Sequence, residues 1–157
     1  MNRVKLWLVA GALGACVAAP PGWGASRAET SSARKEAKEY FAKGHEHQEA
    51  KRYKEAIAAY ERSLQKDPLQ AEALSNLGFC HRKLKQYQKA IQYYHEALEL
   101  NPKLAEAHEY LGEAYVELGQ LRQAEQEYQA LLDLAPEDAE ELKAKIDEAR
   151  AAGLDAR

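Results

Sequence analysis

The stretch LSNLGFCHRKLKQYQKAIQYYHEALELNP, residues 74–102, decides the fold, because its skeleton recurs 34 residues upstream and 34 residues downstream. Four columns of identical residues keep this spacing: Gly44, Gly78 and Gly112; Ala56, Ala90 and Ala124; Tyr60, Tyr94 and Tyr128; Pro68, Pro102 and Pro136. Four independent columns in one register do not arise by chance in a chain of 157 residues. A fixed period of this size is typical of an array of paired helices.

The composition favours helices and excludes one class of function. Alanine, glutamate, lysine, leucine and glutamine are abundant and β-branched residues are few, so strands are not expected. Hydrophobic residues make up 46% of the chain, which is ample for a core. With 30% charged residues and a net charge of −3, the surface lacks the basic face that sequence-independent nucleic-acid binding requires.

The repeated columns resemble those of the tetratricopeptide repeat, a helix–turn–helix unit, over about residues 37–136. The second unit matches best, with these residues in family columns: Leu74, Leu77, Gly78, Ala90, Tyr94, Ala97 and Pro102. Lys43, Ser63, His108 and Leu131 depart from the pattern, which bears on local packing rather than on the fold. The resemblance implies an all-α, right-handed superhelical solenoid of antiparallel helix pairs.

The repeat register and the composition of the ends predict the domain organisation. Its parts are a signal peptide at 1–15, a flexible tether at 16–31, three repeats at 32–68, 69–102 and 103–136, a capping helix at 137–153 and a tail at 154–157. Helices are expected over 32–50, 53–66, 69–84, 87–100, 103–118, 121–134 and 137–151. Ser32 is expected to cap the first helix, and Asp67 and Asn101 to cap helices that open with Pro68 and Pro102.

The recurring glycines predict close packing inside each unit. Glycine within a helix costs about 1 kcal/mol relative to alanine, so three such positions need an offsetting gain. We expect the paired helix to approach these glycines with no side chain between the backbones, and the Tyr60, Tyr94 and Tyr128 column to fill the space between units. The last helix has one apolar stripe and one charged face, as a terminal cap requires.

The N-terminus is typical of an exported protein. Arg3 and Lys5 precede the apolar run 6–19, which is too short for a bilayer span of about 20 residues, so a secretory signal is predicted. The tetrapeptide ending at Cys16, LGAC, resembles the bacterial lipobox, which implies cleavage before Cys16 and lipid on its thiol. Val17 is not acidic, which by the same resemblance implies the outer membrane. Ordinary cleavage, for instance after Ala28, would instead give a soluble periplasmic or secreted protein.

No catalytic, cofactor or convincing metal motif accompanies the repeats. The sequence contains no Gly-rich phosphate loop, no Cys-x-x-Cys and no ordered Ser, His and Asp set, so we expect no enzymatic activity and no cofactor. His45 and Glu49 share one helical face but have no third ligand nearby, so we expect no metal. Cys80 is interpreted as a small buried thiol.

The resemblance also implies a binding face, because the first helix of each tetratricopeptide unit lines the concave side. The residues expected to form this groove are Phe41, His45, Asn76, Phe79, Arg82, Lys83, Glu109, Tyr110 and Glu113. Phe41 and Phe79 would form an aromatic patch, Arg82 and Lys83 a basic middle, and the third unit an acidic wall. Exposed aromatic rings beside charges are common in sites for peptides and protein partners.

Some relatives bind chaperone C-termini through a carboxylate clamp of Lys, Asn and Arg. Only Asn76 matches that clamp here. Phe41 and His45 replace the first Lys–Asn pair, and Glu106 and Tyr110 replace the last Lys–Arg pair, so a carboxylate would be repelled. The sequence predicts a scaffold of the bacterial envelope, tethered through Cys16, that binds a protein segment. The alternatives are a soluble secreted or periplasmic adaptor and an accessory subunit of an envelope enzyme.

Overall fold

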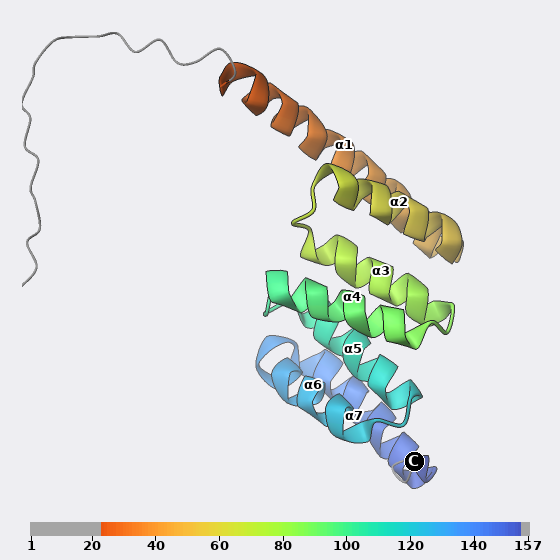
Figure 1. The fold of residues 1–157 in the computed structure, drawn as a ribbon. Helices are drawn as coiled ribbons and strands as arrows, with labels where there is room; N and C mark the ends of the chain where they lie inside the picture. The colour runs from red at the N-terminus through yellow and green to blue at the C-terminus, as the bar shows by residue number, and fades with distance from the viewer. Residues whose placement is uncertain (1–22, 155–157) are drawn as a thin grey trace, which may run out of the picture.

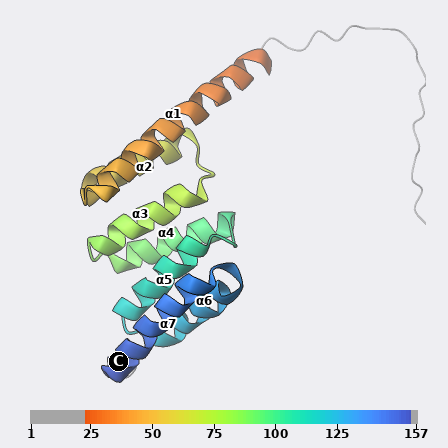
Figure 2. The ribbon, with the colours of Figure 1, turned by 180° about the vertical axis from the view of Figure 1, so that it is seen from behind.

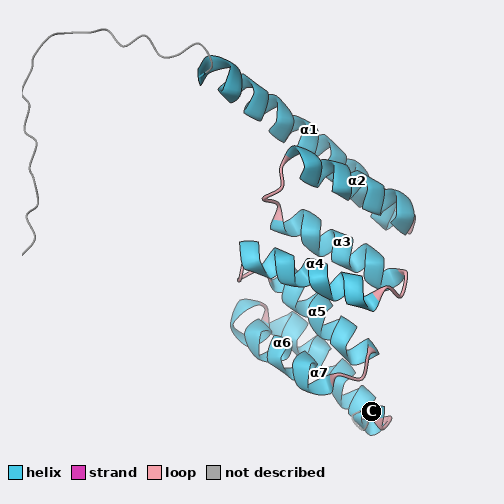
Figure 3. Cartoon of the chain, viewed as in Figure 1, coloured by secondary structure: helices cyan, strands magenta, loops and turns pink. Residues whose placement is uncertain are grey.

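The computed structural model describes residues 23–154, which form seven helices and no strand (Figure 3). The helices are α1 Trp23–Glu49, α2 Tyr53–Lys66, α3 Ala71–Lys83, α4 Tyr87–Leu100, α5 Ala105–Glu117, α6 Leu121–Leu134 and α7 Pro136–Ala151. The predicted signal peptide, the lipidation site Cys16 and the last three residues lie outside the described residues.

Successive antiparallel helix pairs stack along one direction. The pairs α1–α2, α3–α4 and α5–α6 follow one another, and α7 packs on the last pair (Figures 1 and 2). The first helices α1, α3, α5 and α7 lie towards the viewer in Figure 2, whereas α2, α4 and α6 lie towards the viewer in Figure 1. This arrangement confirms the predicted all-α solenoid.

The turns inside the three pairs repeat with the same period as the sequence. Lys51, Lys85 and Gly119 all have positive φ, at 57°, 60° and 71°. In each turn the next amide N–H donates to a carbonyl near the end of the first helix, over 2.8–2.9 Å, as in a Schellman motif. Left-handed backbone is strained for lysine and unstrained for glycine, so the first two turns are strained and the third is not.

The turns between units differ from the prediction. The side chains of Asp67 and Asn101 accept hydrogen bonds from the backbone N–H groups of Leu69 and Lys103, over 3.3 and 3.2 Å. They therefore stabilise the turns and do not cap the helices. As a result α3 and α5 begin at Ala71 and Ala105, and Pro68 and Pro102 lie in the turns. The prediction that Pro68 and Pro102 open helices is therefore wrong, whereas Pro136 is the first residue of α7.

The first helix begins earlier than predicted. It starts at Trp23, so residues 23–31 of the expected flexible tether are helical. Ser32 lies inside the helix, where its hydroxyl is 3.5 Å from a carboxylate oxygen of Glu36, and is not the N-cap. Ala, Arg and Glu favour helix, and no proline follows Pro21 in this part of the chain, so the helix continues towards the N-terminus.

Two members of the glycine column, Gly44 and Gly78, pack against tyrosine rings and not against the backbone of the paired helix. A Cβ atom built on Gly44 would lie 2.5 Å from Cε1 of Tyr60, and one on Gly78 would lie 2.5 Å from Cε1 of Tyr94. Both tyrosines are fully buried. The prediction that no side chain stands between the two backbones is therefore wrong for these two units, because a tyrosine ring of the paired helix packs against each glycine.

The third unit departs from this pattern. The space beside Gly112 is filled by the side chain of Leu142 on α7, and Tyr128 is only half-buried. Tyr60 and Tyr94 also share core clusters with Leu77 and Leu111 of the following units, as predicted for the space between units, whereas Tyr128 is not fully buried. The stripe of α7 is buried as expected, with Ala139, Leu142, Ile146 and Ala149 in the core.

Cys80 is completely buried, as interpreted from the sequence. Burial raises the pKa of its thiol to about 12, so the thiolate is absent at neutral pH. Because the thiolate is the reactive form, Cys80 is an inert packing residue.

Candidate functional site

The helices α1, α3, α5 and α7 form one face of the molecule, called here the first-helix face (Figure 2). This face carries a cluster of aromatic and charged side chains. The rings of Phe79 and Tyr110 lie 5.0 Å apart between centroids. The guanidinium of Arg82 lies 5.6 Å from the Phe79 ring, and Nζ of Lys83 lies 4.9 Å from it. Residues three and four positions apart share one helix face, which is why both cations of α3 reach this ring.

Arg82 is a structural residue rather than a free basic group. Only 4% of it is exposed, and its guanidinium forms ion pairs with the carboxylates of Glu113 and Glu117 on α5. A buried guanidinium with two carboxylate partners is not available to a ligand, because breaking such a pair is strongly unfavourable. The predicted basic middle of the groove is therefore reduced to Lys83, which is exposed.

A further side chain, from α7, extends this network. Nζ of Lys145 pairs with Glu113, so one line of charges joins α3, α5 and α7. Sequence reasoning missed Lys145, whereas Glu117 belongs to the acidic wall that was expected of the third unit. The available signal was the 34-residue period itself, because continuing it past Pro136 makes α7 a fourth first helix on the same face.

Glu109 is the most perturbed carboxyl group of the face. Burial raises its pKa to about 7, and the carboxylates of Glu113, Asp138 and Glu141 act in the same direction, while Lys145 opposes them. Near neutral pH this carboxyl is therefore partly protonated and can donate as well as accept a hydrogen bond. Among the side chains of residues 31–154, no group of three or more His, Cys, Asp or Glu is suited to a metal ion.

The remaining predicted residues lie apart from the cluster or beneath it. Phe41 packs on Tyr60, with ring centroids 5.5 Å apart, so the aromatic patch pairs Phe79 with Tyr110 rather than with Phe41. His45 is exposed and lies 3.5 Å from Glu49. Asn76 is 5% exposed. The structure thus brings together Phe79, Arg82, Lys83, Tyr110 and Glu113.

A hollow of about 500 Å³ opens beside this cluster, at the end of the face near the C-terminus. Its lining combines cluster residues with side chains of α5, α7 and the segment after α7: Arg82, Lys83, Glu113, Val116, Glu117, Lys145, Glu148, Ala149, Ala152 and Leu154. Such an open, mixed polar and apolar hollow accommodates side chains of a peptide segment.

Models of one protein family match more than half of the chain. Three models, each described as a tetratricopeptide repeat, match residues 37–69, 71–104 and 93–126. The comparison with curated proteins found no match. None of the helices in the described part of the chain has the length and apolar character needed to cross a membrane.

Many solved structures share the fold. The first TPR domain of Spaghetti (RPAP3), bound to the HSP90 peptide SRMEEVD, is 27% identical, with a TM-score of 0.70 over 75% of this chain and 95% of that chain. The first TPR domain of the human RPAP3 protein is 26% identical, with a TM-score of 0.72 over 78% and 98% of the two chains. The TPR domain of Arabidopsis OM64, at 19% identity and a TM-score of 0.69 over 74% and 98%, shares the fold.

Proposed function

The chain belongs to the tetratricopeptide repeat family, and we propose that it is a non-enzymatic scaffold that binds a segment of a partner protein on its first-helix face. Domains of this fold are generally protein-binding modules. The observation that carries the proposal is the cluster of Phe79, Tyr110 and Lys83, where half-buried rings lie beside an exposed cation. Rings that are already packed lose little conformational entropy on binding, which suits them as anchors for a ligand.

The same face disfavours one kind of ligand. The Spaghetti domain is bound to a peptide that ends in acidic residues. Here Glu106 and Tyr110 stand where the carboxylate clamp of some relatives has Lys and Arg, and Arg82 is occupied by Glu113 and Glu117. Fluorescence anisotropy with labelled SRMEEVD should therefore show no saturable binding; micromolar binding would contradict the assigned charge pattern.

The binding test compares two double variants in pull-downs from crosslinked envelopes, read by mass spectrometry. Phe79→Ala with Lys83→Glu removes the proposed anchor ring and reverses the exposed charge, and should abolish capture. Arg82 is left unchanged, because its substitution would break a buried ion pair. Leu132→Ala with Lys103→Glu makes the same kinds of change at exposed positions elsewhere and should leave capture intact. Equal capture by both variants would identify the first-helix face as the wrong surface.

We place this scaffold in a bacterial envelope, tethered by lipid on Cys16. The supporting observation in the sequence is LGAC at the end of the apolar run. The early start of α1 at Trp23 also affects how far the repeats would lie from the membrane. Glu36, 13 residues after the start of α1 at Trp23, pairs with Lys66 of α2 over 2.6 Å, and the N-terminal part of α1 extends beyond α2 (Figure 1). At about 1.5 Å per residue, this extension is roughly 20 Å long and would separate the repeats from the membrane.

Fractionation and intact-mass measurement test the tether. The proposal predicts a membrane-associated protein whose mass begins at Cys16 and includes added lipid, and a soluble form after Cys16→Ser. A soluble wild-type protein cleaved after Ala28 would favour the periplasmic adaptor instead. The binding test does not depend on this outcome, because the first-helix face is the same in both cases.

A further inference from the structure

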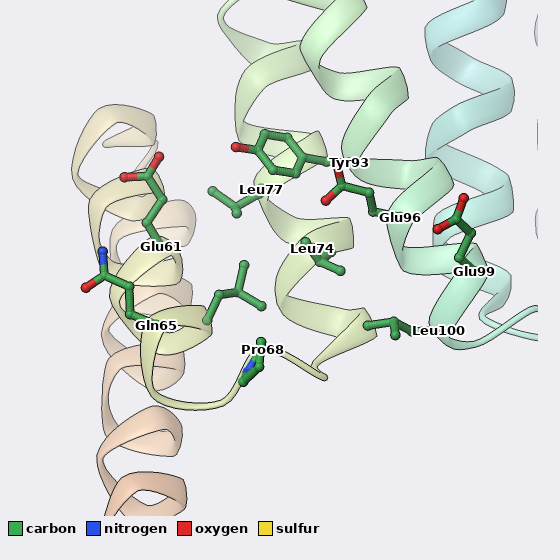
Figure 4. A pocket seen from close by; sticks show the side chains of 10 residues that line it. Glu61, Gln65, Pro68, Leu74, Leu77, Tyr93, Glu96, Glu99 and Leu100 are labelled. Carbon is green, nitrogen blue, oxygen red and sulfur yellow. The ribbon is translucent and has the colours of Figure 1, made fainter.

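A second hollow lies between the second helices of the first two units, and we call it the outer groove. Its walls are α2 and α4, its floor is α3, and its volume is about 560 Å³ (Figure 4). The lining residues are Glu61, Leu64, Gln65, Pro68, Leu74, Leu77, Tyr93, Glu96, Glu99 and Leu100.

The outer groove is separate from the first-helix face. Leu77 lines the groove and Phe79 belongs to the cluster on the first-helix face, and both are on α3. Two residues along an α-helix correspond to a rotation of about 200°, so the two side chains leave α3 on opposite sides. A ligand in the outer groove would therefore not compete directly with one at Phe79.

The floor and mouth of the outer groove are apolar. Leu74 and Leu77 form the floor, and the Tyr93 ring is held in place by stacking on His81, with centroids 5.3 Å apart. Leu100, at the mouth, is 42% exposed, and Leu69, next to the lining residue Pro68, is 75% exposed. Among residues 31–154, two of the three exposed large hydrophobic residues thus lie in the lining or next to it in the sequence.

The rim of the outer groove is acidic. Glu61 on one wall and Glu96 and Glu99 on the other are all exposed, and the lining contains no basic side chain (Figure 4). None of these three carboxylates takes part in the ion pairs found among residues 31–154. Burial raises the pKa of the Tyr93 hydroxyl, and Glu61 and Glu96 act in the same direction, which places both carboxylates near the ring.

We infer that the outer groove binds a segment of a partner protein in which aliphatic side chains are flanked by Lys or Arg. The aliphatic side chains would pack on the half-buried Leu64 and Tyr93 and on the exposed Leu100, and the cations would meet the three glutamates of the rim. The chain is then an adaptor with two binding surfaces on opposite sides of α3.

A second copy of the chain does not supply such a segment from its described surface. Its other exposed large hydrophobic residue is Leu132. Leu132 is followed by Asp133, and an acidic neighbour would be repelled by an acidic rim. Charge complementarity therefore favours a basic partner over self-association.

The test uses the full chain and a fluorescein-labelled amphipathic peptide of leucine and lysine, with a companion peptide in which every lysine is replaced by glutamate. The lysine peptide should bind and the glutamate peptide should not. The triple variant Glu61→Lys, Glu96→Lys, Glu99→Lys should weaken binding at least about tenfold, because three exposed charge pairs become repulsive.

Matched variants locate the site. Glu39→Lys, Glu46→Lys, Glu140→Lys makes the same change in net charge at exposed positions on α1 and α7, and should weaken binding by less than about twofold. Phe79→Ala should have no effect on this peptide. The proposal is overturned if the two triple variants weaken binding equally, if only Phe79→Ala does so, if the glutamate peptide binds as well, or if the groove variant instead dissociates a dimer in size-exclusion chromatography.

Discussion

The second and third repeats follow the same sequence columns, yet their cores are built from different partners. In the second repeat, Gly78 is covered by Tyr94 from its own paired helix. In the third repeat, Gly112 is covered by Leu142 from α7, and Tyr128 moves to a half-buried position. An inner repeat is thus completed within its own helix pair, whereas the terminal repeat depends on the capping helix.

The outer surfaces of the two repeats differ as well. Leu74 and Tyr93 line the outer groove in the second repeat. Thirty-four residues later the same columns hold His108 and Glu127, whose side chains form a hydrogen bond of 2.7 Å. An apolar floor in one repeat is therefore a polar bridge between α5 and α6 in the next. The same 34-residue period thus accompanies an apolar hollow in one repeat and a hydrogen-bonded pair in the next.

The largest expected contrast is between the losses of stability caused by Tyr94→Ala and by Tyr128→Ala. Tyr94→Ala should lower the free energy of unfolding by about 3–5 kcal/mol, because a fully buried ring leaves a cavity. Tyr128→Ala should cost less than about 2 kcal/mol, since that ring is already half-buried. Chemical denaturation followed by circular dichroism measures both values. Equal costs would remove the distinction between the inner and terminal repeats.

The glycines should show a smaller contrast. Gly78→Ala adds a methyl group against the buried Tyr94 ring, and overpacking should outweigh the gain in helix propensity, for a net loss of about 1–2 kcal/mol. Gly112→Ala meets mainly the end of the flexible Leu142 side chain, so its net effect should lie within about 0.5 kcal/mol of zero. Thermal unfolding midpoints compare the two variants. A midpoint for Gly112→Ala as low as that for Gly78→Ala would contradict this account.

The polar bridge of the third repeat should make stability depend on pH. The hydrogen bond with Glu127 raises the pKa of His108 above its ordinary value, against the effect of burial. The charged imidazole therefore stabilises the fold below the ordinary histidine pKa of about 6.5, and this stabilisation is lost as pH rises through the folded pKa. His108→Gln should therefore cost more free energy of unfolding at about pH 5.5 than at about pH 9.

The control for this pH effect is Glu127→Gln, which removes the carboxylate that stabilises the charged imidazole. In that background, His108→Gln should have the same cost at both pH values. Denaturant titrations of the four proteins at each pH measure the effect. A cost of His108→Gln that increases with pH would show that the sign of the pKa shift is wrong.

The smallest expected effect concerns the turns. Lys85→Gly should stabilise the second repeat by about 0.5 kcal/mol, because glycine relieves the left-handed backbone at φ 60° but increases the entropy of the unfolded chain. Gly119→Lys should destabilise the third repeat, since a Cβ atom there would lie 2.9 Å from the carbonyl oxygen of Leu154. A loss of stability in Lys85→Gly would count against strain in this turn.

The helix pairs, and the repeated positions that pack inside them, could be predicted from the sequence, because both follow from the 34-residue period. The sequence did not predict the burial or hydrogen bonding of a side chain where a residue of another repeat, or a choice between two local partners, determines it. Arg82 stands in a groove-lining column, but Glu113 and Glu117 of the next repeat bury it. The Asp67 side chain binds the turn rather than the helix, a choice between two local hydrogen bonds that residue type alone does not decide.

The binding role of the first-helix face is the central claim, and site-specific photocrosslinking tests it most directly. Phe79 is replaced by p-benzoylphenylalanine in one sample and Leu132 in another, and envelopes are irradiated and their adducts identified by mass spectrometry. The account predicts a discrete adduct with one partner from position 79 and none from position 132. Adducts from position 132 alone, or none from either position in a folded protein, would contradict it.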